Sequence, residues 1–185
     1  RGHHKNIGTD EDPASARFNE WVYAFWFRSV TGGYLHAWKR EADRRRRERK
    51  PVLSWQNEML RFQVFQALYL LAIGWGFGWK LVPYAIAIAF FGILMLECVN
   101  YIEHYGLRRK KGPSGKYEPV SPRHSWNSDH EVGRIFLYEL TRHSDHHYKA
   151  TRKYQVLRHF EESPQLPFGY PTSIILALIP PLWFR

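Results

Sequence analysis

Three histidines fall within five residues of one short segment, at His143, His146 and His147. On a helix, positions i, i+3 and i+4 share a face, so the three rings can converge on one point. Neutral imidazole binds zinc, copper, iron or nickel. Burying three rings without a ligand is costly because each ring has two nitrogens that need partners. The segment therefore predicts a metal site, and the alternative is a histidine patch on the surface.

Asp145 lies inside the same segment, between the first and second of these histidines. A carboxylate beside a metal site often accepts a hydrogen bond from a ligand ring and fixes its tautomer. Asp145 is therefore a candidate for supporting the metal ligands. It could equally be a solvated surface acid, and the sequence leaves both interpretations open.

A second group of polar residues ends a long apolar run. Glu97 and Asn100 precede His104 by seven and four residues, which places all three on one helical stripe. A carboxylate inside an apolar membrane helix is costly and normally has a partner. We expect Glu97 and Asn100 to support His104, or Glu97 to bind the metal directly. Glu103 points to another side of the helix, and we expect it to be structural.

His3 and His4 form a third group, which is a weak signal taken alone. Adjacent residues cannot face the same way on a helix, although both could reach a space between two metal ions. His124 and His130 are six residues apart, a poor spacing for ligands on one helix. We expect them to pack and hydrogen-bond in a loop around the site. The isolated histidines are expected to be structural: His36 and His159.

Charge is distributed very unevenly along the 185 residues, whose formal net charge is +10. Residues 1–61 carry 13 lysines and arginines, residues 108–185 carry another 13, and Lys80 is the only one between them. The single cysteine, Cys98, excludes an intrachain disulfide and any site built from cysteines alone.

The centre has few charges and contains two apolar runs, residues 62–79 and 81–102, with Glu97 as the only charge in the second. A membrane-spanning helix needs about 20 mostly apolar residues. The second run meets this length, the first is marginal, and Lys80 and Pro83 lie between them as a short turn requires. We therefore predict an all-α integral membrane bundle with two spanning helices. The alternative is a buried helical hairpin of a soluble protein.

Basic residues flank both polar ends of these runs, at residues 44–50 upstream and 108–111 downstream. By the positive-inside rule both flanks face the cytoplasm. Because the membrane explains these charges, we do not expect nucleic acid as a partner. The apolar segment 173–184 is too short to span and is expected to be a re-entrant or interfacial helix broken at Pro180–Pro181.

Several linked motifs resemble the membrane-embedded bacterial alkane 1-monooxygenases. Residues 100–107 (NYIEHYGL), 124–130 (HSWNSDH) and 142–147 (RHSDHH) are similar to signature segments of that family. Residues 2–4 (GHH) and 10–17 (DEDPASAR) resemble its second histidine box and the segment after it, and further matches continue to residue 167. Single boxes of this kind recur in fatty acid desaturases and hydroxylases, but the combination is specific.

The resemblance implies that the chain is the C-terminal portion of a larger six-helix membrane oxygenase of the bacterial inner membrane. Residues 1–185 would form a single domain, with cytoplasmic catalytic segments at 1–61 and 103–172. Two non-haem irons would be bound by the family's histidines, here His3, His4, His104, His143, His146 and His147. Second-layer support would come from Glu97, Asn100, Asp145 and His130. The family's first HExxH box is absent, which implies further ligands from outside this chain.

The implied reaction is terminal hydroxylation of medium- and long-chain n-alkanes to primary alcohols. It uses O2 and electrons from rubredoxin, which is reduced by an NADH-dependent reductase. Such a substrate partitions into membrane lipid, which suits a site at the membrane. Three alternatives stay open. One is a related di-iron oxygenase acting on xylene-type methyl groups or fatty acyl chains, and another is a histidine-rich membrane protein that binds zinc or nickel without redox chemistry. The third is a structural two-helix membrane module whose histidines are incidental.

Overall fold

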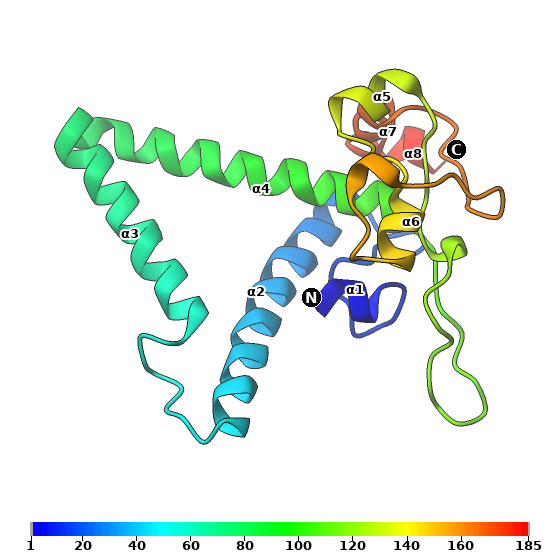
Figure 1. The fold of residues 1–185 in the computed structure, drawn as a ribbon. Helices are drawn as coiled ribbons and strands as arrows, with labels where there is room; N and C mark the ends of the chain where they lie inside the picture. Colours follow the sequence, from blue (N-terminus) through cyan, green and yellow to red (C-terminus); the bar gives the residue numbers. More distant parts are fainter. Residues whose placement is uncertain (1, 185) are drawn as a thin grey trace. The chain divides into compact units, whose positions relative to one another are not determined.

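The computed structural model describes residues 2–184, and within this range the regular structure is helical apart from two isolated β-bridges (Figure 1). The all-α prediction is therefore confirmed. The α-helices are α1 (Gly2–Asn6), α2 (Val22–Arg47), α3 (Glu58–Phe77), α4 (Val82–His104), α5 (Glu131–Phe136), α6 (His143–Tyr148), α7 (Tyr170–Ala177) and α8 (Pro180–Trp183). The short 3-10 helices are η1 (Trp79–Leu81), η2 (Pro122–His124) and η3 (Tyr154–Val156).

The chain divides into two compact units. Unit 1 contains the described residues up to Val30 and those from Leu96 onward, and unit 2 is Thr31–Met95. Helices α2 and α4 each begin in one unit and end in the other. The units are described separately below.

In unit 2, helix α3 begins at a well-defined cap. The Asn57 side chain accepts a hydrogen bond from the backbone N–H of Leu60, which satisfies one of the free amides in the first helical turn. The helix ends at Gly78, whose φ of 102° is accessible to glycine and strained for other residues. The break between the two apolar runs is therefore at Gly78, and Pro83 lies in the first turn of α4, where proline is tolerated.

Of the two predicted spanning helices, one meets the criteria. Within the described residues, only the segment Trp79–His104 is long and apolar enough to cross a membrane. Helix α3 has the predicted position but carries Arg61, Gln63 and Gln66 near its start. The outer side chains of α4 are apolar and exposed, for example Ile88 at 72%. An apolar helix this exposed needs a partner surface or lipid.

The basic run at the end of α2 is not a uniform solvated patch. Arg45 is 2% exposed, and its guanidinium donates to Ser54 Oγ and Gln56 Oε1, each at 3.0 Å, and to Pro51 O at 3.3 Å. It therefore fixes the loop between α2 and α3. The neighbouring Arg46 is exposed, so only part of the run is available to a lipid headgroup or a protein partner.

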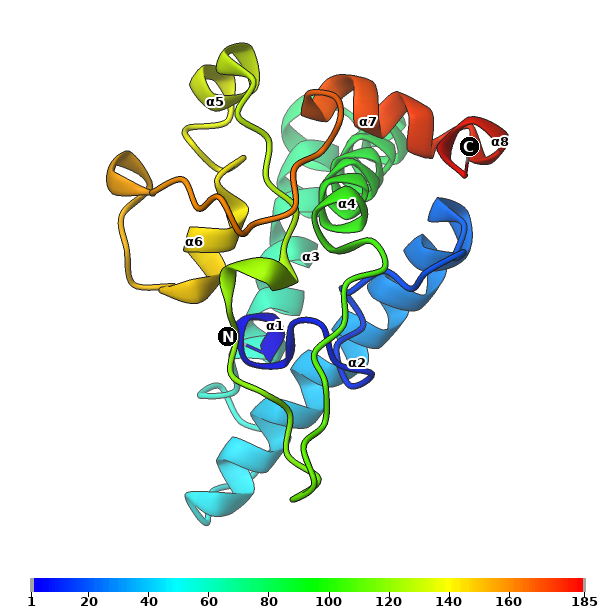
Figure 2. The same cartoon turned by 90° about the vertical axis from the view of Figure 1, so that its right-hand side faces the viewer.

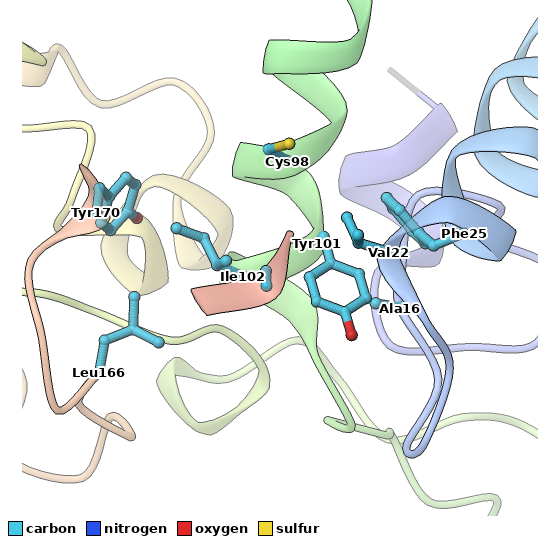
Figure 3. Close-up of a cluster of buried hydrophobic side chains, with 9 residues drawn as sticks. Ala16, Val22, Phe25, Cys98, Tyr101, Ile102, Leu166 and Tyr170 are labelled. Carbon is cyan, nitrogen blue, oxygen red and sulfur yellow. The ribbon is translucent and has the colours of Figure 1, made fainter. Parts of the chain in front are cut away.

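The core of unit 1 surrounds the last turns of α4. Figure 3 shows Tyr101 on the side of α4 that faces Val22 and Phe25, and Ile102 on the side of Leu166 and Tyr170. Helix α7 packs beside the end of α4 (Figure 2), with Ala177 in the same cluster. The core fixes the position of His104, two residues after Ile102.

The C-terminal apolar segment is broken as predicted. Helix α7 ends at Ala177, and α8 begins at Pro180, with Leu178 and Ile179 between them. Trp183 of α8 stacks on the ring of Tyr101, with 5.6 Å between centroids. The two short helices therefore cover the end of α4.

Candidate metal centre

Helix α6 presents His143, His146 and His147, as their spacing predicted. It has only six residues, too few to be stable alone, so its position depends on tertiary contacts. Asn127 supplies two of them: its Oδ1 accepts from the Ser144 backbone N–H at 2.9 Å, and its Nδ2 donates to Ser144 Oγ at 2.8 Å. The loop that contains Asn127 therefore holds the helix that carries three rings.

The end of α4 presents His104. The helix stops there because the chain turns at Gly106, whose φ is 71°, and the Gly106 N–H donates to the Ala16 carbonyl at 3.1 Å. This bond joins the end of α4 to the N-terminal segment. His104 is 1% exposed, so its ring faces the protein interior.

Helix α1 presents His3 and His4 and is also held by tertiary contacts. The Arg109 backbone N–H donates to the Gly8 carbonyl at 2.8 Å, and its side chain donates to the Lys5 carbonyl at 3.1 Å. Residues next to the end of α4 therefore fix the N-terminal segment, and α1, α4 and α6 meet in unit 1 (Figures 1 and 2).

Six imidazole rings from these three helices form one cluster. The ring centroids of His3 and His104 are 4.8 Å apart, and those of His3 and His147 are also 4.8 Å apart. The ring centroid of His4 lies 4.8 Å from that of His146 and 4.7 Å from that of His147. The structure thus brings together all six predicted histidines: His3, His4, His104, His143, His146 and His147.

Ligand atoms of four of these rings, those of His3, His104, His143 and His147, lie within 4.8 Å of one another. His143 Nε2 is 3.2 Å from His104 Nε2 and 2.8 Å from His147 Nε2. Nitrogens that bind one ion at about 2.1 Å lie about 3 Å apart, so these separations suit a shared metal.

Hydrogen bonding among the rings alone leaves the cluster poorly satisfied. A neutral imidazole has one donor and one acceptor, so three converging Nε2 atoms cannot all be paired with one another. The Nδ1 atoms of His104, His143 and His147 are buried and have no hydrogen-bond partner among residues 2–184. A cation at the point where the Nε2 atoms converge would be coordinated by all of their lone pairs. A set of imidazole nitrogen donors fits iron or zinc.

Burial keeps the rings in the form that binds metals. Burial, with the neighbouring rings, lowers the pKa of His143 and His147 well below the usual histidine value. It lowers the pKa of His4 to about 4, with further contributions from His146 and His3. At neutral pH these imidazoles are uncharged, and a neutral ring nitrogen can coordinate a metal without first losing a proton.

Sequence reasoning missed Asp12. The side chain is buried, and its Oδ2 lies 2.8 Å from His3 Nδ1. The same oxygen accepts a hydrogen bond from Ser15 Oγ at 2.6 Å. Burial alone would raise the pKa of Asp12, but the hydrogen bonds from His3 and Ser15 outweigh it and lower the pKa. The carboxylate fixes the proton of His3 on Nδ1 and leaves Nε2 for the cluster. The sequence signal that could have identified Asp12 was its position in residues 10–17, the segment that resembles the family's sequence after the second histidine box.

The structure also corrects the expectation for Glu103. Its carboxylate is fully buried rather than directed away from the site, and its Oε2 lies 3.1 Å from His143 Nε2. The last turn of α4 therefore directs two consecutive side chains toward the cluster, because His143 Nε2 lies within reach of both His104 Nε2 and Glu103 Oε2. Helical periodicity within α4 could not predict where His143 would lie.

The predicted supporting residues are only partly near the rings. Glu97 and Asn100 are half-buried on α4, and no hydrogen bond joins either to a histidine ring among residues 2–184. Asp145 is buried but bonds Arg152 and Arg158 instead of a ring, so it is neither a surface acid nor a hydrogen-bond acceptor for a histidine. It ties the loop after α6 to that helix.

His130 lies away from the cluster. It is exposed and precedes the first turn of α5, next to Gly169. His124 is buried, with its Nδ1 accepting from the Ser121 backbone N–H and its Nε2 near Glu118, which confirms a packing role in the loop. The other two histidines are exposed: His36 and His159, the latter paired with Asp129.

Comparison with known proteins gives a consistent result. Residues 1–174 match the fatty acid desaturase family. The chain is 46% identical over 183 residues to alkane 1-monooxygenase 1 of Pseudomonas aeruginosa, covering 99% of this chain and 48% of that protein. It is 47% identical over 184 residues to alkane 1-monooxygenase of Acinetobacter baylyi, covering 100% of this chain and 45% of that protein.

A more distant relative is named for another substrate. The chain is 28% identical over 182 residues to the xylene/toluene monooxygenase hydroxylase component XylM of Pseudomonas putida, covering 98% of this chain and 48% of that protein. The chain spans about half the length of the curated relatives it matches.

Proposed function

The chain belongs to the fatty acid desaturase family, and within it we propose that the protein hydroxylates the terminal carbon of medium- and long-chain n-alkanes. The substrate class is supported by identities of 46% and 47% to alkane 1-monooxygenases, against 28% to the xylene/toluene enzyme. The products would be a primary alcohol and water, formed from the alkane, O2, two electrons and two protons.

The observation that carries the proposal is the convergence of six imidazoles from α1, α4 and α6. The histidines of α1 and α4 are about 100 residues apart in the sequence, and those of α4 and α6 are about 40 apart, so proximity in the chain does not explain the cluster. We propose that the six histidines hold two iron ions.

Side chains alone cannot carry out this reaction. A terminal alkane C–H bond has no acidic proton, so general acid–base catalysis offers no route to it. Bound iron would supply the redox chemistry that activates O2 against such a bond. The protein residues hold the imidazoles neutral by burial, orient His3 through Asp12, and exclude water around His143 and His147.

The membrane placement belongs to the same proposal. The candidate span ends at His104, so a helix crossing the bilayer would place the cluster at one membrane surface. The basic residues that follow, residues 108–111, support placing that surface on the cytoplasmic side of a bacterial inner membrane. An alkane dissolved in the bilayer would then approach along the apolar surface of α4.

Rubredoxin, with its reductase and NADH, is the proposed electron donor. The net charge of +10 and the exposed basic residues favour an acidic partner. The buried Arg45 is excluded from such a surface because it holds the loop after α2.

The test uses the full natural polypeptide that contains this chain, purified into lipid nanodiscs with iron, rubredoxin, the reductase and NADH. We expect octane or dodecane to yield the primary alcohol, with oxygen from ¹⁸O-labelled O2 detected by mass spectrometry. Turnover of xylenes or fatty acyl chains without turnover of alkanes would replace the substrate class. Bound zinc without iron or O2 uptake would refute the oxygenase proposal.

A further inference from the structure

The Glu103 carboxylate has no role in the function proposed above. Glu103 is the second-last residue of α4 and is 1% exposed. Its Oε1 accepts a hydrogen bond from the Tyr170 hydroxyl at 2.9 Å. In the described part of the chain its ion-pair partner is the imidazole of His143, at 3.1 Å, and not an arginine or lysine. A buried carboxylate with this environment calls for another source of positive charge.

The free oxygen of Glu103 faces the point where the ligand nitrogens converge. Glu103 Oε2 is 3.1 Å from His143 Nε2, and the same nitrogen lies 3.2 Å from His104 Nε2 and 2.8 Å from His147 Nε2. Glu103 Oε2 therefore belongs to the same group of atoms as the proposed nitrogen ligands.

The protonation of His143 decides what the contact means. If Nε2 binds a metal through its lone pair, that nitrogen carries no proton and cannot donate to Glu103. Two lone pairs 3.1 Å apart repel each other unless a cation lies between them. Nitrogen and oxygen ligands of one ion, each at about 2.1 Å, are themselves about 3 Å apart.

We propose that Glu103 supplies an oxygen ligand to the ion bound by His143, with Tyr170 as the positioning residue that holds the other carboxylate oxygen. The inference rests on the proposed metal centre and deepens it, because one of the two ions would have a mixed nitrogen and oxygen donor set. Tyr170 is itself buried at the start of α7, so its hydroxyl is fixed by the core of unit 1.

The experiment measures iron binding and iron spectra, independently of turnover. The full natural polypeptide is reconstituted with ⁵⁷Fe, and the variants Glu103→Gln, Glu103→Asp and Tyr170→Phe are compared with Glu131→Gln. Glu131 is an exposed carboxylate in the first turn of α5 and serves as the matched control. Chelator competition gives the affinity, Mössbauer spectroscopy reports the ligands, and circular dichroism checks the fold.

We expect Glu103→Gln to weaken retention of one iron by more than about 10-fold and to change the Mössbauer spectrum of that iron alone. Glu103→Asp should keep part of the affinity, Tyr170→Phe should lose less than Glu103→Gln, and Glu131→Gln should match the wild type. If Glu103→Gln does not fold, the variants Glu103→Asp and Tyr170→Phe test the inference instead. A wild-type Mössbauer spectrum in both variants overturns it.

Failure of this inference can be separated from failure of the proposed function. A wild-type protein that binds iron, with a Glu103→Gln variant of unchanged spectrum, removes Glu103 from the ligand set and leaves the function standing. Weaker binding with an unchanged spectrum also overturns the ligand role. A wild-type protein that binds no iron refutes the metal centre itself, and this inference with it.

Discussion

Replacing Asp12 by alanine should loosen the metal centre without removing a ligand. The change deletes the oxygen that lies 2.8 Å from His3 Nδ1 and leaves the hydroxyl of Ser15, 2.6 Å away, without its acceptor. His3 could then rotate and exchange tautomers, so its Nε2 would no longer be held toward the cluster. The affinity for metal should fall because metal binding would then have to fix the orientation and tautomer of the His3 ring.

The magnitude follows from the lost hydrogen bond. A hydrogen bond to a charged group contributes about 1.5–3 kcal/mol, and the Asp12 carboxylate is buried and anionic. At about 1.4 kcal/mol per factor of ten, this predicts metal binding that is about 10- to 100-fold weaker. The range agrees with the cost of losing an outer-layer partner of a ligand histidine.

The assay is iron retention under chelator competition for Asp12→Ala, Asp12→Asn and Asp10→Asn in the full natural polypeptide. Asp10 is an exposed acid two residues away and provides the matched control. We expect Asp12→Asn to fall between the wild type and Asp12→Ala, since an amide oxygen can still accept a weaker bond. Retention by Asp12→Ala within twofold of the wild type would refute the reasoning.

Two further substitutions test the ligands and the hairpin. His143→Ala should lose bound iron while the exposed His159→Ala keeps it, as measured by metal analysis, and equal iron contents would contradict the cluster assignment. Gly74→Ala should destabilise the α3–η1 turn by about 1–3 kcal/mol in thermal unfolding, because its Cβ would lie 2.5 Å from the Trp79 ring. Gly76→Ala, whose Cβ meets nothing within 4 Å, should be neutral, and equal effects would show that packing on Trp79 is not the cause.

Local sequence pattern predicted the two apolar helices but gave no bounds for α2, the longest helix of the described residues. The apolar runs became α3 and α4, since a long run of good helix-forming residues is a local property. The break fell at Gly78, because only glycine readily adopts its positive φ. The first run failed as a candidate span because Arg61 and the nearby glutamines dilute it. The burial of Arg45 was not predicted, since its partners come from a loop folding back on α2.

The candidate site also contains residues that local sequence pattern predicted and residues that it misplaced. The spacing of His143, His146 and His147 predicted one helical face, and the structure has that helix. The same reasoning misplaced Asp145, because its arginine partners lie seven and thirteen residues further along the chain. It also excluded Glu103 from the site, since its contact is with His143, which lies 40 residues further along the chain.

The sequence by itself determined which residues could bind a metal and which segments are helical, because side-chain chemistry and helical periodicity act over a few neighbouring residues. Only the tertiary structure decided that His3 meets His104 and His4 meets His147, and that Asp12 and Glu103 face the rings. Those contacts depend on the core around Tyr101 and on backbone hydrogen bonds between distant segments, and no local pattern encodes them.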